Sequence, residues 1–179
     1  EVESVIDLQQ ELADDELVLE FILNDDDGYG ILISSQRVNF FQLNQVPTLN
    51  NSILRLKSFL SAPLLKKQQL LEYRMLAFDV YQYLFPEKEL ADIDLKGKKL
   101  TVVPDHNLQN FPFEALVTDS KVPLNDAYLI RDLEINYAYS ISFHKENEKV
   151  FRENKPLAIS GFAPVQFASQ GLSELKRSR

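Results

Sequence analysis

Residues 99–117, with the sequence KLTVVPDHNLQNFPFEALV, constrain the fold of this chain more than any other segment. They begin with an almost wholly apolar run that ends at Pro104. Such short runs are typical of strands covered on both faces, as in the sheets of α/β proteins. A polar turn follows, and the Phe-Pro-Phe sequence at 111–113 predicts that the chain then re-enters the core. Because the residue before a proline is pushed away from the helical region, we expect an extended start there and a brief helix at 114–116.

Residues 16–43 carry the clearest strand signal. The segments ELVLEFIL, YGILIS and VNFFQL are rich in β-branched and aromatic residues, and turn-forming residues separate them. We predict a three-stranded antiparallel meander. Asp25, Asp26 and Asp27 lie in its first turn, but they lack the alternating ligands and distal Glu of a calcium loop. We therefore interpret them as a solvated hairpin tip.

Two helical patterns follow the predicted meander. The first covers 50–61 and begins with a capping signal among Asn50, Asn51 and Ser52. The second covers 64–85, an amphipathic helix of about six turns at 3.6 residues per turn, and Pro86 ends it. Its predicted apolar stripe consists of Leu64, Leu71, Met75, Phe78, Tyr81, Leu84 and Phe85. A stripe of this kind can line a pocket, but we interpret it as a face packed on the core.

Later segments alternate between strands, loops and short helices. A polar connector over 87–98 turns at Gly97, and one or two short strands are expected around 133–137. Residues 142–151 resemble a short helix, and the LAIS sequence at 157–160 predicts another buried strand. The order of elements predicts an α/β sandwich with a mixed or partly parallel sheet.

Composition excludes several kinds of site. The chain has no cysteine, so it contains no disulfide, no thiolate metal site and no Cys nucleophile. Its two histidines, His106 and His144, have no metal-binding spacing, and we expect no metal and no cofactor. The net charge is −8 and no basic face is evident, so we expect no nucleic-acid binding. No apolar run reaches about 18 residues, so we expect no membrane span and a cytoplasmic location.

Two groups of polar residues could form a catalytic site. Asp105 and His106 are adjacent at a predicted strand end, where α/β proteins often place site residues. An acid–base pair is conceivable there, but we interpret Asp105 as a turn-former that bonds backbone N–H groups. We also expect Glu114 to cap a helix or to pair with a cation such as Arg131.

The second group brings a serine and a histidine close together in sequence. It consists of His144 with Ser140, Ser142 and Asp132. A catalytic triad is built by tertiary geometry, which closeness in sequence does not provide. We therefore assign no catalytic residue to either group.

The 99–142 region resembles the CHAT family of caspase-like cysteine peptidases, which are often fused to tetratricopeptide repeats. The matching positions are Val102, Val103, Pro104, Asp105, Leu108, Phe111, Pro112, Phe113, Glu114, Ala115 and Leu116. The segments YLIRDLEINYAYS and PLAISGFAP resemble those that follow in the family. The resemblance covers nearly the whole chain but is weak over 1–60. The family usually has Gly where this chain has His106, and often has His at the position of Gln109.

The resemblance implies a caspase–haemoglobinase-like α/β sandwich. It would be incomplete here and preceded by the antiparallel β meander and two helices. Residues 16–179 would form the amino-terminal part of a CHAT-like domain, and 1–15 a linker or the tail of an upstream helical region. The family's catalytic His and Cys come later in its sequence, so no catalytic residue is carried over. The resemblance leaves three alternatives: the chain is a truncated form of the domain, a proteolytic piece of a longer protein, or a catalytically dead version of the family.

Two hypotheses about function follow from this resemblance. In the first, the chain is the scaffold portion of a caspase-like cysteine endopeptidase and is inactive alone. Its partners would be the carboxy-terminal catalytic part of the same protein, upstream helical repeats and a protein substrate. In the second, it is a non-catalytic pseudo-peptidase module for protein–protein interaction.

Overall fold

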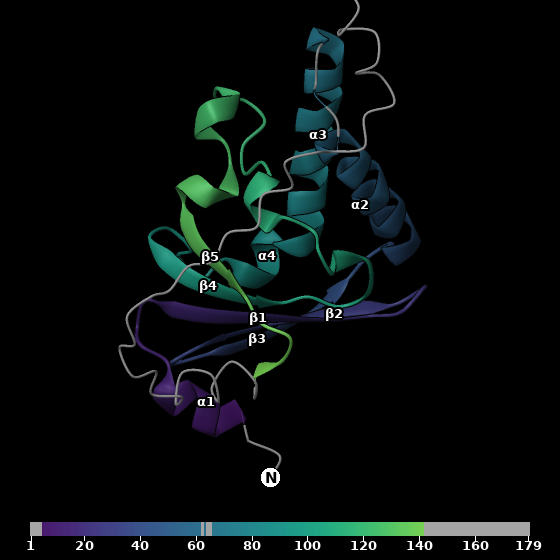
Figure 1. Cartoon of the computed structure of the whole chain (residues 1–179). Coiled ribbons are helices and arrows are strands. Elements are labelled where there is room, and N and C mark those ends of the chain that lie inside the picture. Colours follow the sequence, from purple (N-terminus) through teal and green to yellow (C-terminus); the bar gives the residue numbers. More distant parts are fainter. Residues whose placement is uncertain (1–4, 62, 64–65, 142–179) are drawn as a thin grey trace, which may run out of the picture. The chain divides into compact units, whose positions relative to one another are not determined.

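The computed structural model describes residues 5–61, 63 and 66–141, and all of these belong to one compact unit. They form a mixed α/β structure around an open five-stranded sheet with strand order β3-β2-β1-β4-β5 (Figure 1). The strands are β1 (Glu16–Leu23), β2 (Gly28–Ser34), β3 (Val38–Leu43), β4 (Lys98–Val103) and β5 (Leu133–Tyr137). The predicted fold class, an incomplete α/β sandwich, is confirmed.

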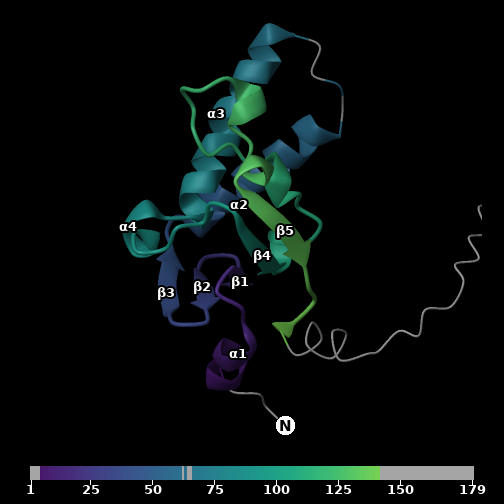
Figure 2. The ribbon, with the colours of Figure 1, turned by 90° about the vertical axis from the view of Figure 1, so that its left-hand side faces the viewer.

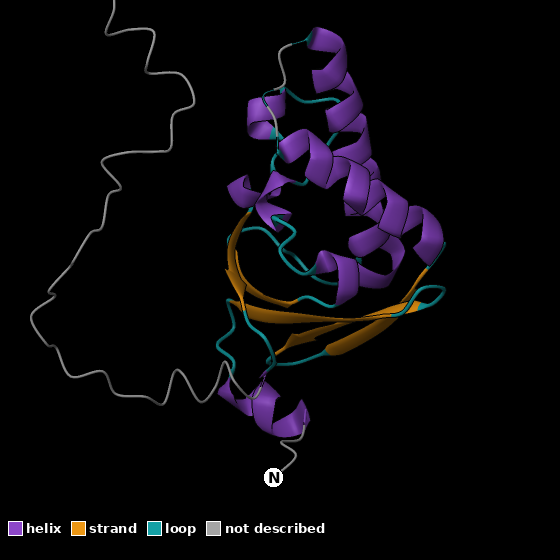
Figure 3. Ribbon diagram, turned by 45° about the vertical axis from the view of Figure 1, so that its right-hand side comes forward, coloured by secondary structure: helices purple, strands orange, loops and turns teal. Residues whose placement is uncertain are grey.

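The sheet combines an antiparallel part with a parallel part. β2 pairs antiparallel with β1 and with β3, which confirms the predicted meander. β4 lies parallel to both β1 and β5. β3 and β4 run in the same direction, so the chain between them must cross back over the sheet, and its described residues form three helices. They are α2 (Val46–Leu60), α3 (Lys67–Leu84) and α4 (Glu87–Leu90), and they lie on one face of the sheet (Figure 3).

The main core lies between the sheet and these helices. Alternate residues of β1, such as Leu19 and Phe21, face it, and β4 contributes Leu100 and Val102. The segment after β4 returns to this core, as its Phe-Pro-Phe sequence predicts. Phe113 is fully buried and stacks on Phe21, with ring centroids 5.8 Å apart. A short 3-10 helix, Phe113–Ala115, follows at about the predicted place.

Helix α2 begins at Val46, four residues before the predicted start. Gln45 precedes it in the left-handed region, with φ 54°, and Pro47 lies in the first turn. Proline suits that position because the N–H it lacks has no partner within the helix. Val46 and Leu49 are both fully buried, so packing fixes the first turn against the sheet. The expected cap at 50–52 was wrong because those polar residues lie within the helix.

Helix α3 buries a different stripe from the predicted one. Its buried residues are Tyr73, Ala77, Val80 and Leu84. Leu71 and Met75, which we placed in the stripe, are 53% and 54% exposed. The helix is turned so that the Tyr73 hydroxyl donates a hydrogen bond to Ala115 O, at 2.6 Å. The prediction holds for Leu84 and for Phe85, which is buried just after the helix, and in part for Phe78 and Tyr81, which are partly buried against the core. Leu64 lies outside the described residues.

The opposite face of the sheet is covered at one end only, among the described residues. Helix α1 (Val5–Glu11) lies on this face, away from α2 and α3 (Figure 2). Leu8 of α1 packs with Val18 and Val103. On the part of this face that α1 does not cover, Ile22 of β1 and Phe40 of β3 are 50% and 62% exposed. We call the patch formed by Ile22, Tyr29, Ile31, Val38 and Phe40 the open sheet face.

Two predicted elements lie outside the described residues: the helix over 142–151 and the strand over 157–160. The predicted domain bounds, 1–15 and 16–179, therefore stay predictions. Within the described part of the chain, no helix is long and apolar enough to cross a membrane.

Candidate binding pocket

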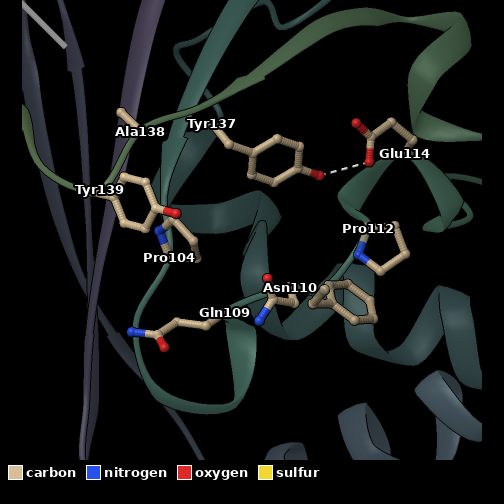
Figure 4. Close-up of a pocket in the computed structure, with 9 residues that line it drawn as sticks. Pro104, Gln109, Asn110, Pro112, Glu114, Tyr137, Ala138 and Tyr139 are labelled. Atoms are coloured by element: carbon tan, nitrogen blue, oxygen red, sulfur yellow. Dashed lines mark hydrogen bonds between the residues drawn. The ribbon is translucent and has the colours of Figure 1, made fainter. Parts of the chain in front are cut away.

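The carboxyl ends of β4 and β5 meet at one edge of the sheet because the two strands are parallel. Pro104 follows β4, and Ala138 and Tyr139 follow β5. In α/β proteins, ligands commonly bind beyond the carboxyl ends of the strands. A pocket of about 600 Å³ opens at this edge (Figure 4). It is lined by Pro104, Gln109, Asn110, Phe111, Pro112, Glu114, Tyr137, Ala138 and Tyr139.

Asp105 starts the loop that forms one wall of this pocket. Its Oδ1 accepts a hydrogen bond from the backbone N of His106 at 2.8 Å, and its Oδ2 accepts one from Leu23 N at 2.9 Å. The carboxylate thus caps the short helix 106–108 and ties the loop to the end of β1. The interpretation of Asp105 as a turn-former is confirmed. The His106 ring is directed instead toward Asp25, with Nε2 and Oδ1 4.0 Å apart at the surface.

His106 and Asn110 give this loop its shape through left-handed backbone conformations. Their φ angles are 49° and 56°. Such angles favour Gly, and Asn and His adopt them more readily than most other residues. A glycine at the position of His106 would adopt the same angle without steric strain.

Lys57 of α2 holds the same loop from the other side. Its Nζ donates to Asn107 O at 2.7 Å and to Gln109 O at 2.8 Å. Desolvation lowers the pKa of Lys57. The loop is therefore fixed by a carboxylate at its start and by an ammonium group at its centre.

Glu114 and Tyr137 form the polar centre of the pocket. The Tyr137 hydroxyl donates to Glu114 Oε2 at 2.6 Å and accepts from Phe113 N at 2.9 Å. Burial raises the pKa of Tyr137, and the hydrogen bond to Glu114 raises it further, so the phenol stays protonated at neutral pH. The expected pairing of Glu114 with Arg131 was wrong, because Arg131 Nε donates to Asn125 O, at 3.1 Å.

The remaining candidate residues do not meet in the described part of the chain. Asn24 Oδ1 accepts from the backbone N of both Asp26 and Asp27, which confirms the hairpin-tip interpretation. His144 and Ser142 lie outside the described residues, so the group with Ser140 and Asp132 stays untested. Among the described residues, no cluster of three or more His, Asp or Glu side chains could hold a metal ion.

Sequence reasoning missed the two contacts that organise the pocket. Tyr137 bonds to a carboxylate 23 positions away, and Lys57 to carbonyls 50 and 52 positions away. No local pattern signals such contacts, because they depend on how the helices and strands pack.

The Asp105→Ala variant should lose about 1–2 kcal/mol of unfolding free energy, because it leaves two backbone N–H groups without their acceptor. Urea unfolding followed by circular dichroism measures this. Asp25→Ala is the matched control, since the Asp25 side chain is 97% exposed at the hairpin tip. Equal stabilities of the two variants would contradict the assigned role of Asp105.

Comparison with known proteins identifies the family. The family model described as the CHAT domain matches residues 55–176, which include every residue that lines the pocket. No curated protein matches the chain. The match covers more than half of the chain and agrees with its mixed α/β architecture. The chain therefore belongs to the CHAT-domain family, a group of caspase-like, peptidase-related modules.

Proposed function

We infer that this chain is the scaffold portion of a caspase-like cysteine endopeptidase. The 179 residues contain no cysteine, so a Cys nucleophile must come from polypeptide outside them. In the assembled enzyme, a His would act as general base and a Cys thiolate would attack the peptide carbonyl. The pocket at the carboxyl edge of β4 and β5 would form one wall of the substrate cleft.

The open sheet face is the observation that carries this proposal. Ile22 and Phe40 are at least half exposed, although the other face of their strands carries buried residues such as Phe21 and Phe41. Antiparallel strands such as β1–β3 commonly leave one face to solvent, but that face then carries mainly polar residues. An apolar patch left open on a sheet marks a place where further protein packs. The carboxy-terminal catalytic part of the same protein is the partner that the family membership supports.

The test compares the 179-residue chain alone with the chain produced together with a Cys-bearing polypeptide of the same protein. Fluorogenic peptides report cleavage. We expect no cleavage by the chain alone and thiol-sensitive cleavage by the complex. Cleavage by these residues alone, insensitive to thiol reagents, would contradict the proposal.

Surface variants test whether the open sheet face makes the contact. The double variant Ile22→Ser/Phe40→Ser should weaken assembly and the activity that depends on it. The matched control is Leu54→Ser/Met75→Ser, which replaces side chains of similar exposure, 53% and 54%, on the helical layer. Equal assembly of both double variants, measured by native mass spectrometry, would exclude the open sheet face as the interface.

A non-catalytic interaction module is the second candidate. The observation that favours it is the position of β5, the outermost strand of the described sheet on its parallel side. An unpaired strand edge invites pairing with a strand of another protein. A stable complex with a partner that contains no Cys nucleophile, without peptidase activity, would support this candidate over the first.

A further inference from the structure

The pocket at the carboxyl edge of β4 and β5 has a one-sided charge distribution. Among the described residues that line it, Glu114 is the one that carries a charge. The other polar groups are the amides of Gln109 and Asn110 and the hydroxyls of two tyrosines. The nearby Lys57 ammonium is turned to backbone carbonyls of the loop and is not among the lining residues. Within the described part of the pocket, an anionic ligand would therefore meet a carboxylate with no lining cation to offset it, whereas a cationic group would find a counter-ion.

The Glu114 carboxylate is held in a defined orientation. Its Oε2 accepts the Tyr137 hydroxyl at 2.6 Å, and Tyr137 is fixed in turn by Phe113 N. Figure 4 shows the Tyr137 side chain reaching across to Glu114. A carboxylate oxygen has more than one lone pair, so Glu114 keeps acceptor capacity for a second donor.

Aromatic and proline side chains line the same pocket as this carboxylate. Tyr137 and Tyr139 lie on one side of the hollow, and Gln109 and Asn110 lie across from them (Figure 4). The Tyr139 side chain is largely exposed, at 92%. Aromatic faces attract cations, and a planar guanidinium both stacks on a ring and donates to a carboxylate. The apolar walls suit the methylene stem of a long side chain.

The wall opposite the tyrosines is preorganised. Asp105 and Lys57 fix the loop by four hydrogen bonds to backbone groups, and Asn110 holds a left-handed turn within it. A site that is already ordered loses little conformational entropy when a ligand enters. Its volume, about 600 Å³, lies within the usual range of small-ligand pockets, about 300–1,000 Å³. A single carboxylate is a poor site for a metal ion, which takes several oxygen ligands.

From these observations we propose that the pocket binds the arginine side chain of a polypeptide segment, with Glu114 as the counter-ion. Tyr137 positions the Glu114 carboxylate, and the tyrosine rings and prolines enclose the stem. This inference rests on the geometry of the pocket and requires neither a Cys nucleophile nor the partner polypeptide inferred above.

The test uses two capped tripeptides that differ in charge but hardly in shape. Acetyl-Gly-Arg-Gly-amide and its citrulline analogue are titrated into the ¹⁵N-labelled 179-residue chain and followed by NMR. The arginine peptide should shift the amide signals of residues 109–114 and 137–139. The citrulline peptide should bind about tenfold more weakly, as expected for the loss of a charge-assisted hydrogen bond. Equal binding of the two peptides, or shifts confined to another part of the chain, would overturn the proposal.

Variants of the chain test whether Glu114 is the counter-ion of the bound arginine. Glu114→Gln should weaken binding of the arginine peptide about tenfold and leave the citrulline peptide unchanged. Glu134→Gln removes the same charge from an exposed position on β5 and should change neither affinity. Tyr137→Phe keeps the ring but frees the carboxylate, so it should weaken arginine binding less than Glu114→Gln does. If Glu114→Gln and Glu134→Gln bind the arginine peptide equally well, Glu114 is not the counter-ion. Failure here would leave the proposed peptidase scaffold standing, because that proposal is tested by assembly and cleavage.

Discussion

Replacing Phe113 with alanine should lower the free energy of unfolding by about 3–5 kcal/mol, the usual range for a buried Phe. The Phe113 ring is fully buried and contacts three other rings. Its centroid lies 5.8 Å from that of Phe21, 5.4 Å from that of Phe111 and 6.1 Å from that of Tyr137. Removing it leaves a cavity between β1 and the pocket wall that rigid neighbours cannot fill. Urea unfolding of the full chain, followed by far-UV circular dichroism, measures the loss.

The matched control for this experiment is Phe40→Ala. The Phe40 side chain is 62% exposed on the open sheet face, where it stacks on Tyr29 with centroids 5.2 Å apart. This change removes the same atoms from a largely solvated site, so the expected loss is below about 1 kcal/mol. If the two variants lose equal stability, the 111–113 segment is not part of the core as described.

Replacing Gly30 with valine should cost about 3 kcal/mol or more, because overpacking a rigid site displaces backbone and side chains. Gly30 pairs with Phe41 across β2 and β3. A Cβ at Gly30 would lie closer than 3.0 Å to three ring carbons of Phe41. Phe41 is buried in the core, at 2% exposure, so its ring can move only by displacing its packed neighbours. Glycine is therefore required here for the close approach of an aromatic ring.

A compensating change tests this steric cause. Phe41→Ala alone should destabilise by creating a cavity over Gly30. In the double variant Gly30→Val/Phe41→Ala, the valine occupies part of that space, so the combined loss should be smaller than the sum by about 1 kcal/mol or more. Strict additivity in urea unfolding would show that the two positions do not compete for the same volume.

The strands of this fold could be predicted because their signals are local. The β1–β3 meander is rich in β-branched and aromatic residues between turn-forming segments, and β4 is an apolar run that ends at a proline. The helices were predicted with errors because their signals are weaker. In α3 the buried face includes Tyr73 and Ala77, which contribute little to a hydrophobic pattern, whereas Leu71 and Met75 face solvent. Periodicity indicated the helix and the core-facing side of its second half, but it misplaced Leu71 and Met75 and missed Tyr73 and Ala77.

The pocket was only partly predictable. The end of β4 at Pro104 and the return of the chain at Phe111 could be read from the sequence, and they place one wall of the pocket. Its polar centre could not be predicted, because Glu114 meets Tyr137 only when β5 pairs with β4. The Lys57 contacts likewise depend on the packing of α2 beside the loop. Hydrogen bonds between distant residues follow from tertiary structure and leave no local trace.

The central position of β1 sets the order in which this protein can fold during its synthesis. One edge of β1 pairs with β2, the next strand of the same hairpin. The other edge pairs with β4, which is synthesised about eighty residues later. At a translation rate of about 5–20 residues per second, that edge stays unpaired for roughly 4–16 s until β4 has been synthesised. Throughout this interval the nascent meander exposes an apolar strand with unpaired backbone groups, which invites aggregation. The nascent chain is therefore exposed to aggregation at this strand edge until β4 has been made.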